Sequence, residues 1–120
     1  MSASERALAL TQAAARAASD KKGENLVALD VSERMPLSDV FLIVSGTNER
    51  HVISIAEGIE EALGVTGDKA VRREGMRGGR WALMDFNDVL VHVMHDEDRV
   101  YYELERLWKD CPVVDLPDDL

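Results

Sequence analysis

The chain has 120 residues, 46% of them hydrophobic and 31% charged, which is the size and composition of one globular domain. Its apolar runs are too short to cross a bilayer, so we expect no membrane-spanning segment. The N-terminus lacks the cationic lead and long apolar block of a signal peptide, and the single cysteine excludes an internal disulfide. We therefore expect a cytoplasmic protein.

The hydrophobic pattern predicts helices and strands along the whole chain. An Ala-rich helix follows a capping box of Ser2 and Glu5 and ends at the two lysines and the glycine of residues 21–23. "NLVALDV" and "VFLIVSG" predict buried strands, and residues 48–63 predict an amphipathic helix. After a short strand, "AVRRE", the segments "RWALMDF" and "VLVHVM" predict a hairpin, and residues 97–109 predict a closing helix.

This order of elements predicts an α/β (α+β) fold with a single mixed β-sheet of about five strands flanked by helices. No internal repeat or long linker divides the chain, so residues 1–110 are expected to form one domain. Residues 111–120 are rich in Asp and Pro and predict an acidic C-terminal tail that need not be ordered.

The negative charge is concentrated in the last third of the sequence. Residues 1–80 hold 11 cationic and 12 acidic residues, whereas residues 81–120 hold 3 and 11. An acidic segment repels phosphates, so we expect no direct DNA binding and favour a basic protein as the partner. The clustered arginines of "VRREGMRGGR" lack interleaved aromatic residues, which favours a solvated loop, and an RNA contact through them is the weaker alternative.

The sequence shows no convincing catalytic site. Ser45, Gly46 and Thr47 lie at a strand-to-helix junction similar to the Gly-Ser turn of nucleotidyltransferases. The pair of acidic residues that would hold magnesium on the following strand is missing. His92 and His95 point to opposite faces of their strand, so they do not predict a metal site. We expect neither an enzyme nor a bound cofactor or metal.

Five of the six aromatic residues lie in the acidic third of the chain. Strand alternation places Trp81, Leu83 and Asp85 on one face of the predicted hairpin and Ala82 and Met84 on the other. A tryptophan beside carboxylates is typical of an interface hot spot for a basic partner. Trp108, in contrast, is expected to complete the core.

Several segments together resemble one known family. They are "LSDVFLIVSGTNERHVISIAEGIEEAL", the "EG" of residues 74–75, "WALMDFNDVLVHVM" and "RVYYELERLW". In this order and spacing, from about residue 5 to residue 110, they resemble the ribosomal silencing factor family, RsfS, also called the Iojap family.

The resemblance implies a nucleotidyltransferase-like topology without the catalytic carboxylates. It also implies a factor that binds the large ribosomal subunit at ribosomal protein number fourteen and sterically blocks joining of the small subunit, which represses translation under nutrient limitation. It further implies a homodimer when free and, for relatives in organelles, a part in large-subunit assembly. A nucleotidyltransferase-type nucleotide-binding enzyme with unrecognised metal ligands stays open as the alternative.

The resemblance also assigns partner contacts, residue by residue. Asn87 replaces the family's usual Gly at the hairpin turn, where Asn tolerates left-handed backbone angles. The residues that match the family's motifs and are expected to contact the partner are Trp81, Asp85, Asp88, His92, Arg99, Tyr102 and Glu105.

Overall fold

The computed structural model describes residues 2–102, 106 and 108–120, and at residues 100–102 it describes the backbone alone. The helices within these residues are α1 (Glu5–Asp20), α2 (Glu49–Val65) and α3 (Asp96–Tyr102). The strands are β1 (Glu24–Asp30), β2 (Val40–Gly46), β3 (Arg72–Glu74), β4 (Trp81–Asp85), β5 (Val89–His95) and β6 (Val113–Val114).

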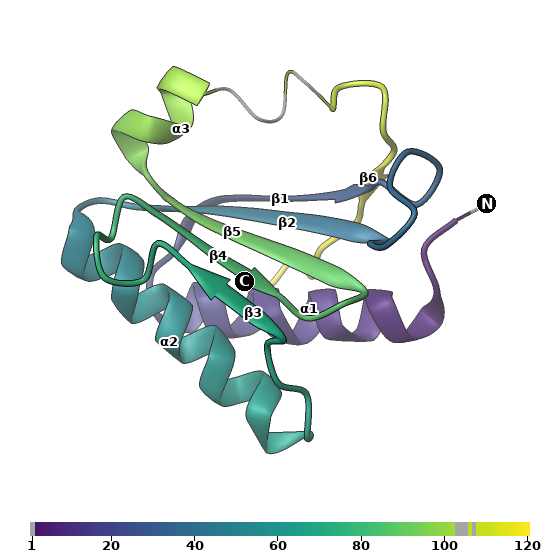
Figure 1. The fold of residues 1–120 in the computed structure, drawn as a ribbon, viewed down its shortest axis with the longest axis horizontal. Coiled ribbons are helices and arrows are strands. Elements are labelled where there is room, and N and C mark those ends of the chain that lie inside the picture. The colour runs from purple at the N-terminus through teal and green to yellow at the C-terminus, as the bar shows by residue number, and fades with distance from the viewer. Residues whose placement is uncertain (1, 103–105, 107) are drawn as a thin grey trace.

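The strands form one mixed sheet in the order β3-β4-β5-β2-β1-β6. The central strands β2 and β5 are parallel, and every other neighbouring pair is antiparallel. Helices α1 and α2 cover one face of the sheet, and α3 lies on the other face (Figure 1). The prediction of a single mixed sheet flanked by helices is confirmed, with six strands in the described residues instead of about five.

The core has one cluster on each side of the sheet. The larger cluster lies under α1 and α2, where the predicted apolar stripe of α2 is fully buried at Val52, Ile55, Ile59 and Leu63. The smaller cluster, on the α3 side, includes Phe41. Every residue of β2 is buried because both faces of this strand are covered, which explains its continuous apolar run.

The start of α1 differs from the prediction. Its N-cap is Ser4, whose hydroxyl accepts a hydrogen bond from the backbone N–H of Ala7 at 3.1 Å. The capping box predicted from Ser2 and Glu5 is therefore wrong, because Glu5 is already the first helical residue. The end of the helix agrees with the prediction, and Lys22 adopts the left-handed conformation there, with a φ of 65°.

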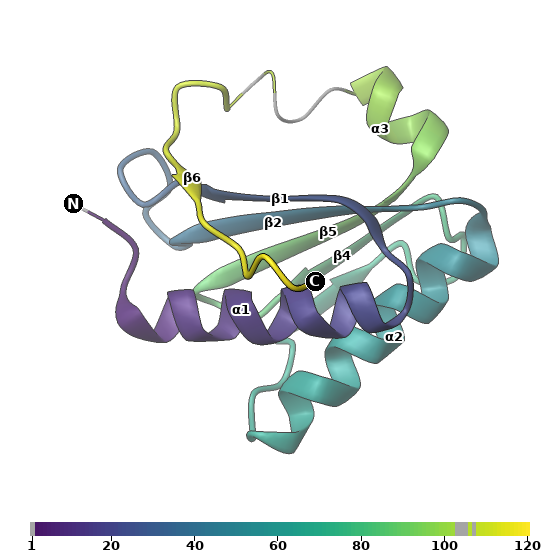
Figure 2. The same ribbon diagram turned by 180° about the vertical axis from the view of Figure 1, so that it is seen from behind.

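The C-terminal segment also differs from the prediction. Residues 113–114 form β6, which pairs with β1, so this part of the expected tail belongs to the sheet. Figure 2 shows the segment passing from β6 to the outside of α1, where the backbone oxygen of Asp115 accepts a hydrogen bond from Gln12 at 2.8 Å. The helix predicted at 97–109 extends over Asp96–Tyr102, residues 103–105 and 107 lie outside the described residues, and Trp108 stands in a turn.

Candidate functional site

The β4–β5 hairpin presents a partly exposed surface on the α3 side of the sheet. As the alternation predicts, Ala82 and Met84 are buried toward the helices, whereas Trp81, Leu83 and Asp85 are half-buried. Leu90 of β5, which pairs with Asp85, is half-buried and packs against the cluster on the α3 side. We call the surface made by Trp81, Leu83, Asp85 and Leu90 the hairpin face.

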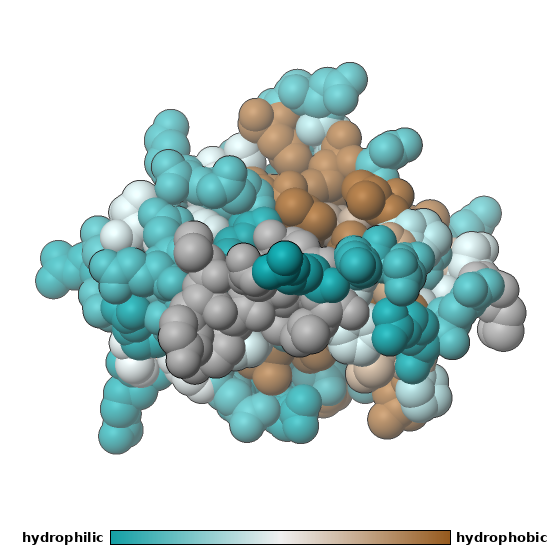
Figure 3. Space-filling view, turned by 90° about the horizontal axis from the view of Figure 1, so that it is seen from above, coloured by the Kyte–Doolittle hydropathy of each residue, from teal (hydrophilic) through white to brown (hydrophobic). Residues whose placement is uncertain are grey.

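Figure 3 looks onto the α3 side of the molecule, where the larger gathering of apolar side chains lies away from β3 and β4, with hydrophilic side chains around it. The alternation that predicts the place of Trp81 also places Leu83. Leu90 also belongs to the hairpin face, but it is not among the partner contacts expected from the sequence. It stands two positions before His92 on the same strand, so the same alternation was the signal that could have found it.

Trp81 is tied to a buried histidine of the neighbouring strand. Its indole Nε1 donates a hydrogen bond to Nδ1 of His92 at 3.1 Å. His92 is 6% exposed, and its ring also makes an edge contact with Phe41, with 5.1 Å between the ring centroids. Burial disfavours the charged imidazolium and lowers the pKa of His92 to about 4. The ring is therefore neutral at physiological pH.

The two aspartates predicted as partner contacts lie at the far end of the hairpin from Trp81. The carboxylate of Asp85 accepts a hydrogen bond from the backbone N–H of Asn87 at 2.8 Å, which holds the turn. Asn87 has a φ of 72°, as the prediction for this turn requires. The carboxylate of Asp88 lies 3.2 Å from Nε of Arg6, a residue of α1. Asp85 therefore belongs to the hairpin face, whereas Asp88 is engaged with the first helix.

Of the three contacts predicted on the closing helix, Arg99 is the one whose side chain the structure describes. Arg99 is 8% exposed, and its Nη1 donates a hydrogen bond to Oγ of Ser45 at 2.9 Å. This guanidinium holds α3 to the end of β2 and is not presented at the surface. The backbone of Tyr102 ends α3, but its side chain and the whole of Glu105 lie outside the described residues.

Three of the clustered arginines, Arg72, Arg73 and Arg80, pair with carboxylates, and Arg72, Arg73 and Arg77 are exposed, in agreement with a solvated strand end and loop. Arg73 pairs with Glu60 at 3.0 Å. Arg80 holds Asp98 of α3 through two bonds, of 2.6 and 3.3 Å. It also contacts Glu49 of α2 and Glu97 of α3, and these hydrogen bonds, with that to Asp98 as the strongest, raise the pKa of Arg80. Arg80 thus joins the start of β4 to both neighbouring helices.

At the strand-to-helix junction after β2, side chains of the junction itself accept hydrogen bonds from its backbone N–H groups. Asn48 caps α2 and accepts a hydrogen bond from the backbone N–H of His51 at 2.8 Å, and the backbone N–H of Thr47 donates to Nδ1 of His51 at 2.9 Å. Among the described residues, no group of three or more His, Cys, Asp or Glu side chains could hold a metal ion. Within the same residues, no helix is long and apolar enough to span a membrane.

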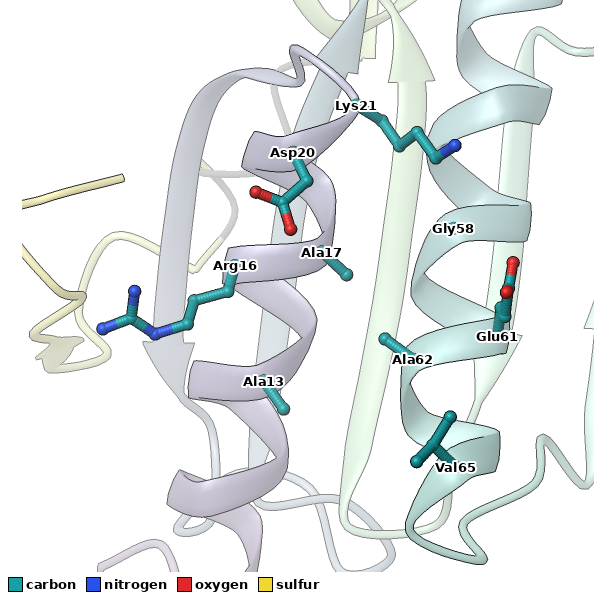
Figure 4. Close-up of a pocket in the computed structure, with 9 residues that line it drawn as sticks. All are labelled: Ala13, Arg16, Ala17, Asp20, Lys21, Gly58, Glu61, Ala62 and Val65. Atoms are coloured by element: carbon teal, nitrogen blue, oxygen red, sulfur yellow. The ribbon is translucent and has the colours of Figure 1, made fainter.

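A groove of about 500 Å³ lies between α1 and α2, on the opposite side of the sheet from the hairpin face. Figure 4 shows the small side chains of Ala13, Ala17 and Ala62 facing it, with Lys21 reaching over Gly58. Arg16 turns away from the groove toward the C-terminal segment, where it pairs with Asp119. Its charged lining residues include Arg16 and Glu61, which lie on the outer sides of the two helices, so the described lining does not bring polar groups together at one point. The groove is the packing contact between α1 and α2.

Comparisons with known proteins agree on one family. The model of the family described as ribosomal silencing factor during starvation matches residues 4–120. A protein of Halalkalibacterium halodurans named ribosomal silencing factor RsfS is 42% identical over 89% of this chain and 92% of its own length. The mouse protein named mitochondrial assembly of ribosomal large subunit protein 1 is 31% identical over 73% of this chain and 40% of its own length. A crystal structure of a protein from Chromobacterium violaceum, 34% identical, superposes with a TM-score of 0.82 and covers 84% of both chains.

Proposed function

We propose that this chain, which belongs to the ribosomal silencing factor family, binds the large ribosomal subunit through ribosomal protein number fourteen and blocks joining of the small subunit. Membership of the family makes the chain a regulatory protein of the ribosome. The name of the mouse relative refers to the large ribosomal subunit, which supports that subunit as the binding partner. We further propose that the protein acts in the cytoplasm, represses translation under nutrient limitation and forms a homodimer when free.

The observation that carries this proposal is the half-exposed Trp81 on the hairpin face. Tryptophan is enriched among residues that contribute most to the free energy of binding, because its large ring excludes water from the centre of an interface. Trp81 is also oriented before binding by its hydrogen bond to His92, so little side-chain freedom is lost on docking.

Charge complementarity supports a basic partner. Asp85 lies on the hairpin face itself, and residues 81–120 hold 11 acidic residues against 3 cationic ones. Carboxylates around an apolar anchor attract a basic protein and speed its association at low salt. The proposed mechanism is competition for one site on the large subunit. The factor needs affinity for that site and enough volume to block the small subunit, and it needs no catalytic turnover.

Sedimentation of purified ribosomal subunits with the protein tests the proposal. We expect the wild type to pellet with large subunits and to reduce subunit joining. Trp81→Ala should weaken binding by about thirtyfold or more, the loss typical of a central tryptophan. Asp85→Ala should weaken it less, with a loss that shrinks as salt is raised. Asp20→Ala, an exposed aspartate of α1 away from the hairpin face, is the charge-matched control and should bind like the wild type.

Two outcomes would contradict the proposal. A wild-type protein that stays in the supernatant would remove the large subunit as partner. If the Trp81→Ala and Asp20→Ala variants bind large subunits equally well, the hairpin face is not the surface that contacts the partner. The homodimer is tested separately by light scattering of the free protein, in which a mass near that of one chain would exclude it.

A further inference from the structure

The buried His92 carries a polar atom that no described residue pairs with. Its Nε2 has less than 1 Å² of exposed surface and no hydrogen-bond partner among the residues that the structure describes. Most buried polar groups in folded proteins are paired, so an unpaired one requires an explanation. His92 lies directly behind the hairpin face, with Leu83 opposite it on β4 and Trp81 bonded to its ring.

The hydrogen bond from Trp81 decides which atom carries the proton. An indole N–H can only donate, so Nδ1 of His92 must be the unprotonated acceptor. In a neutral imidazole the remaining proton then sits on Nε2. Nε2 of His92 is therefore an N–H donor. The hydrogen bond from Trp81 holds the ring in the tautomer that can donate from Nε2.

We propose that this donor is kept for the docking partner, and that Nε2–H of His92 donates a hydrogen bond to a main-chain carbonyl oxygen of the bound protein. This inference rests on the proposed function and adds to it the group that the partner must present. A neutral acceptor fits better than a carboxylate, because the imidazole is neutral and Asp85 lies on the same face. A buried N–H that gains its first acceptor on binding contributes to affinity and discriminates against partners without one.

Burial of Nε2 in the free chain has a consequence for the binding step. A partner oxygen reaches the donor only after side chains over the His92 ring have moved, so docking includes a local rearrangement at the hairpin face. The hydrogen bond from Trp81 to Nδ1 fixes the tautomer and has to persist, so the side chains that move are others over the ring. Side-chain rearrangements of this size are common when proteins associate.

Two substitutions at His92 separate this role from a purely structural one. His92→Phe keeps an aromatic ring and removes the donor, whereas His92→Gln keeps both an N–H donor and a carbonyl acceptor. We expect His92→Phe to remain folded in a urea titration and to bind large subunits at least about tenfold more weakly, which corresponds to about 1.4 kcal/mol. His92→Gln should stay within about threefold of the wild type, even if its folded state is less stable.

The outcomes distinguish this inference from the proposed function. If the wild type and His92→Phe bind large subunits equally well, the donor has no acceptor in the complex, and the inference fails while the proposed function stands. If the wild type does not bind, both fail. Should His92→Phe not fold, the ring of isotope-labelled wild-type His92 gives the answer by NMR. The Nε2 proton should move downfield when the isolated ribosomal protein number fourteen is added, and an unchanged position would overturn the inference.

Discussion

The indole of Trp81 and the imidazole of His92 are joined diagonally across two strands. Trp81 pairs with Met94 in the ladder and His92 pairs with Leu83, yet Nε1 of Trp81 lies 3.1 Å from Nδ1 of His92. Long aromatic side chains can span such diagonal positions on one face of a sheet. The bond couples a half-exposed residue to a buried one, so the position of the surface tryptophan depends on the state of the core.

We predict that stability falls on mild acidification because of His92. Its pKa is about 4 in the folded chain, against 6.5 in the unfolded chain, so the unfolded state binds more protons between these values. The free energy of unfolding should therefore be highest above pH 6.5 and should fall by roughly 2 kcal/mol between pH 7 and pH 4.5. Urea titrations of the wild type and His92→Phe at both pH values measure this difference.

The comparison between these two proteins isolates the histidine. Asp30, Glu49 and Asp68 also have a lowered pKa, against ordinary values of 3.8 for Asp and 4.5 for Glu, so most of their contribution is lost below this window. Both proteins carry these three carboxylates, so any loss inside the window cancels in the comparison. We expect His92→Phe to lose about 2 kcal/mol less than the wild type between pH 7 and pH 4.5. An equal loss in both proteins would show that His92 is not held neutral by burial.

We predict that the two carboxylates of α3 that contact Arg80 differ in importance. Asp98 makes a two-bond contact with Arg80, with the shorter bond at 2.6 Å, and its side chain is 20% exposed. Glu97 lies 3.4 Å from Arg80 and is 75% exposed, so water competes for it. Asp98→Asn should lower the melting temperature by a few degrees, and Glu97→Gln should have little effect. A matching fall in both variants would contradict this assignment.

The salt dependence of the melting temperature is a second test of the ion pair between Asp98 and Arg80. Because ionic screening weakens exposed ion pairs, the difference between the wild type and Asp98→Asn should shrink when the melts are repeated at 1 M salt. Hydrogen exchange measures the local consequence, since the backbone amides of α3 should exchange faster in Asp98→Asn than in Glu97→Gln. Unchanged exchange in α3 would mean that Arg80 does not hold this helix.

The parts of the fold that local patterns encode were predictable, and the long-range contacts were not. The apolar run of β2, the stripe of α2 and the alternation of Trp81 with Ala82 each follow from one segment of sequence. The pairing of Val113 with β1 depends on a free sheet edge far away in the chain, and a strand of two residues directly after a proline gives no signal for it.

The same distinction applies to the candidate site. Trp81 and Asp85 follow from alternation along one strand, and the structure places both on the hairpin face. The bond of Arg99 to Ser45 joins residues 54 positions apart, so the sequence offered the motif of α3 but not the buried position of its arginine. Selection of Ser4 over Ser2 as the helix cap was equally a matter of geometry, since both residues have the right chemistry.

We predict that β6 is held mainly by one of its two valines. Val114 is half-buried and packs against the larger core cluster, whereas Val113 is 69% exposed. Val114→Ala should lower the free energy of unfolding by about 1 kcal/mol, the value for two methyl groups at partial burial. Val113→Ala loses the same groups from a solvated position and should cost less than about 0.5 kcal/mol. Urea titrations with equal slopes test this pair, and a larger effect at Val113 would contradict the placement of β6.

We predict that the backbone of Gly75 is needed to position Trp81. Gly75 has a φ of 74°, and a Cβ at this position would lie 1.9 Å from the carbonyl oxygen of Trp81. Such a contact is far inside van der Waals distance, so Gly75→Ala must shift the start of β4 and the indole that begins it. We expect a loss of about 1–3 kcal/mol in the free energy of unfolding, measured by urea titration. We also expect large-subunit binding at least about tenfold weaker, because the anchor no longer fits.

Gly78, in the same loop, is the matched control. A Cβ at Gly78 would meet no atom within 4 Å, and its φ lies outside the left-handed range. Gly78→Ala should therefore keep wild-type binding and should raise stability by up to about 1 kcal/mol, since alanine restricts the unfolded chain. Sedimentation with large subunits compares the two variants directly. The two changes differ mainly in whether Trp81 is displaced. If a folded Gly75→Ala variant binds large subunits as well as Gly78→Ala does, binding does not depend on the position of Trp81.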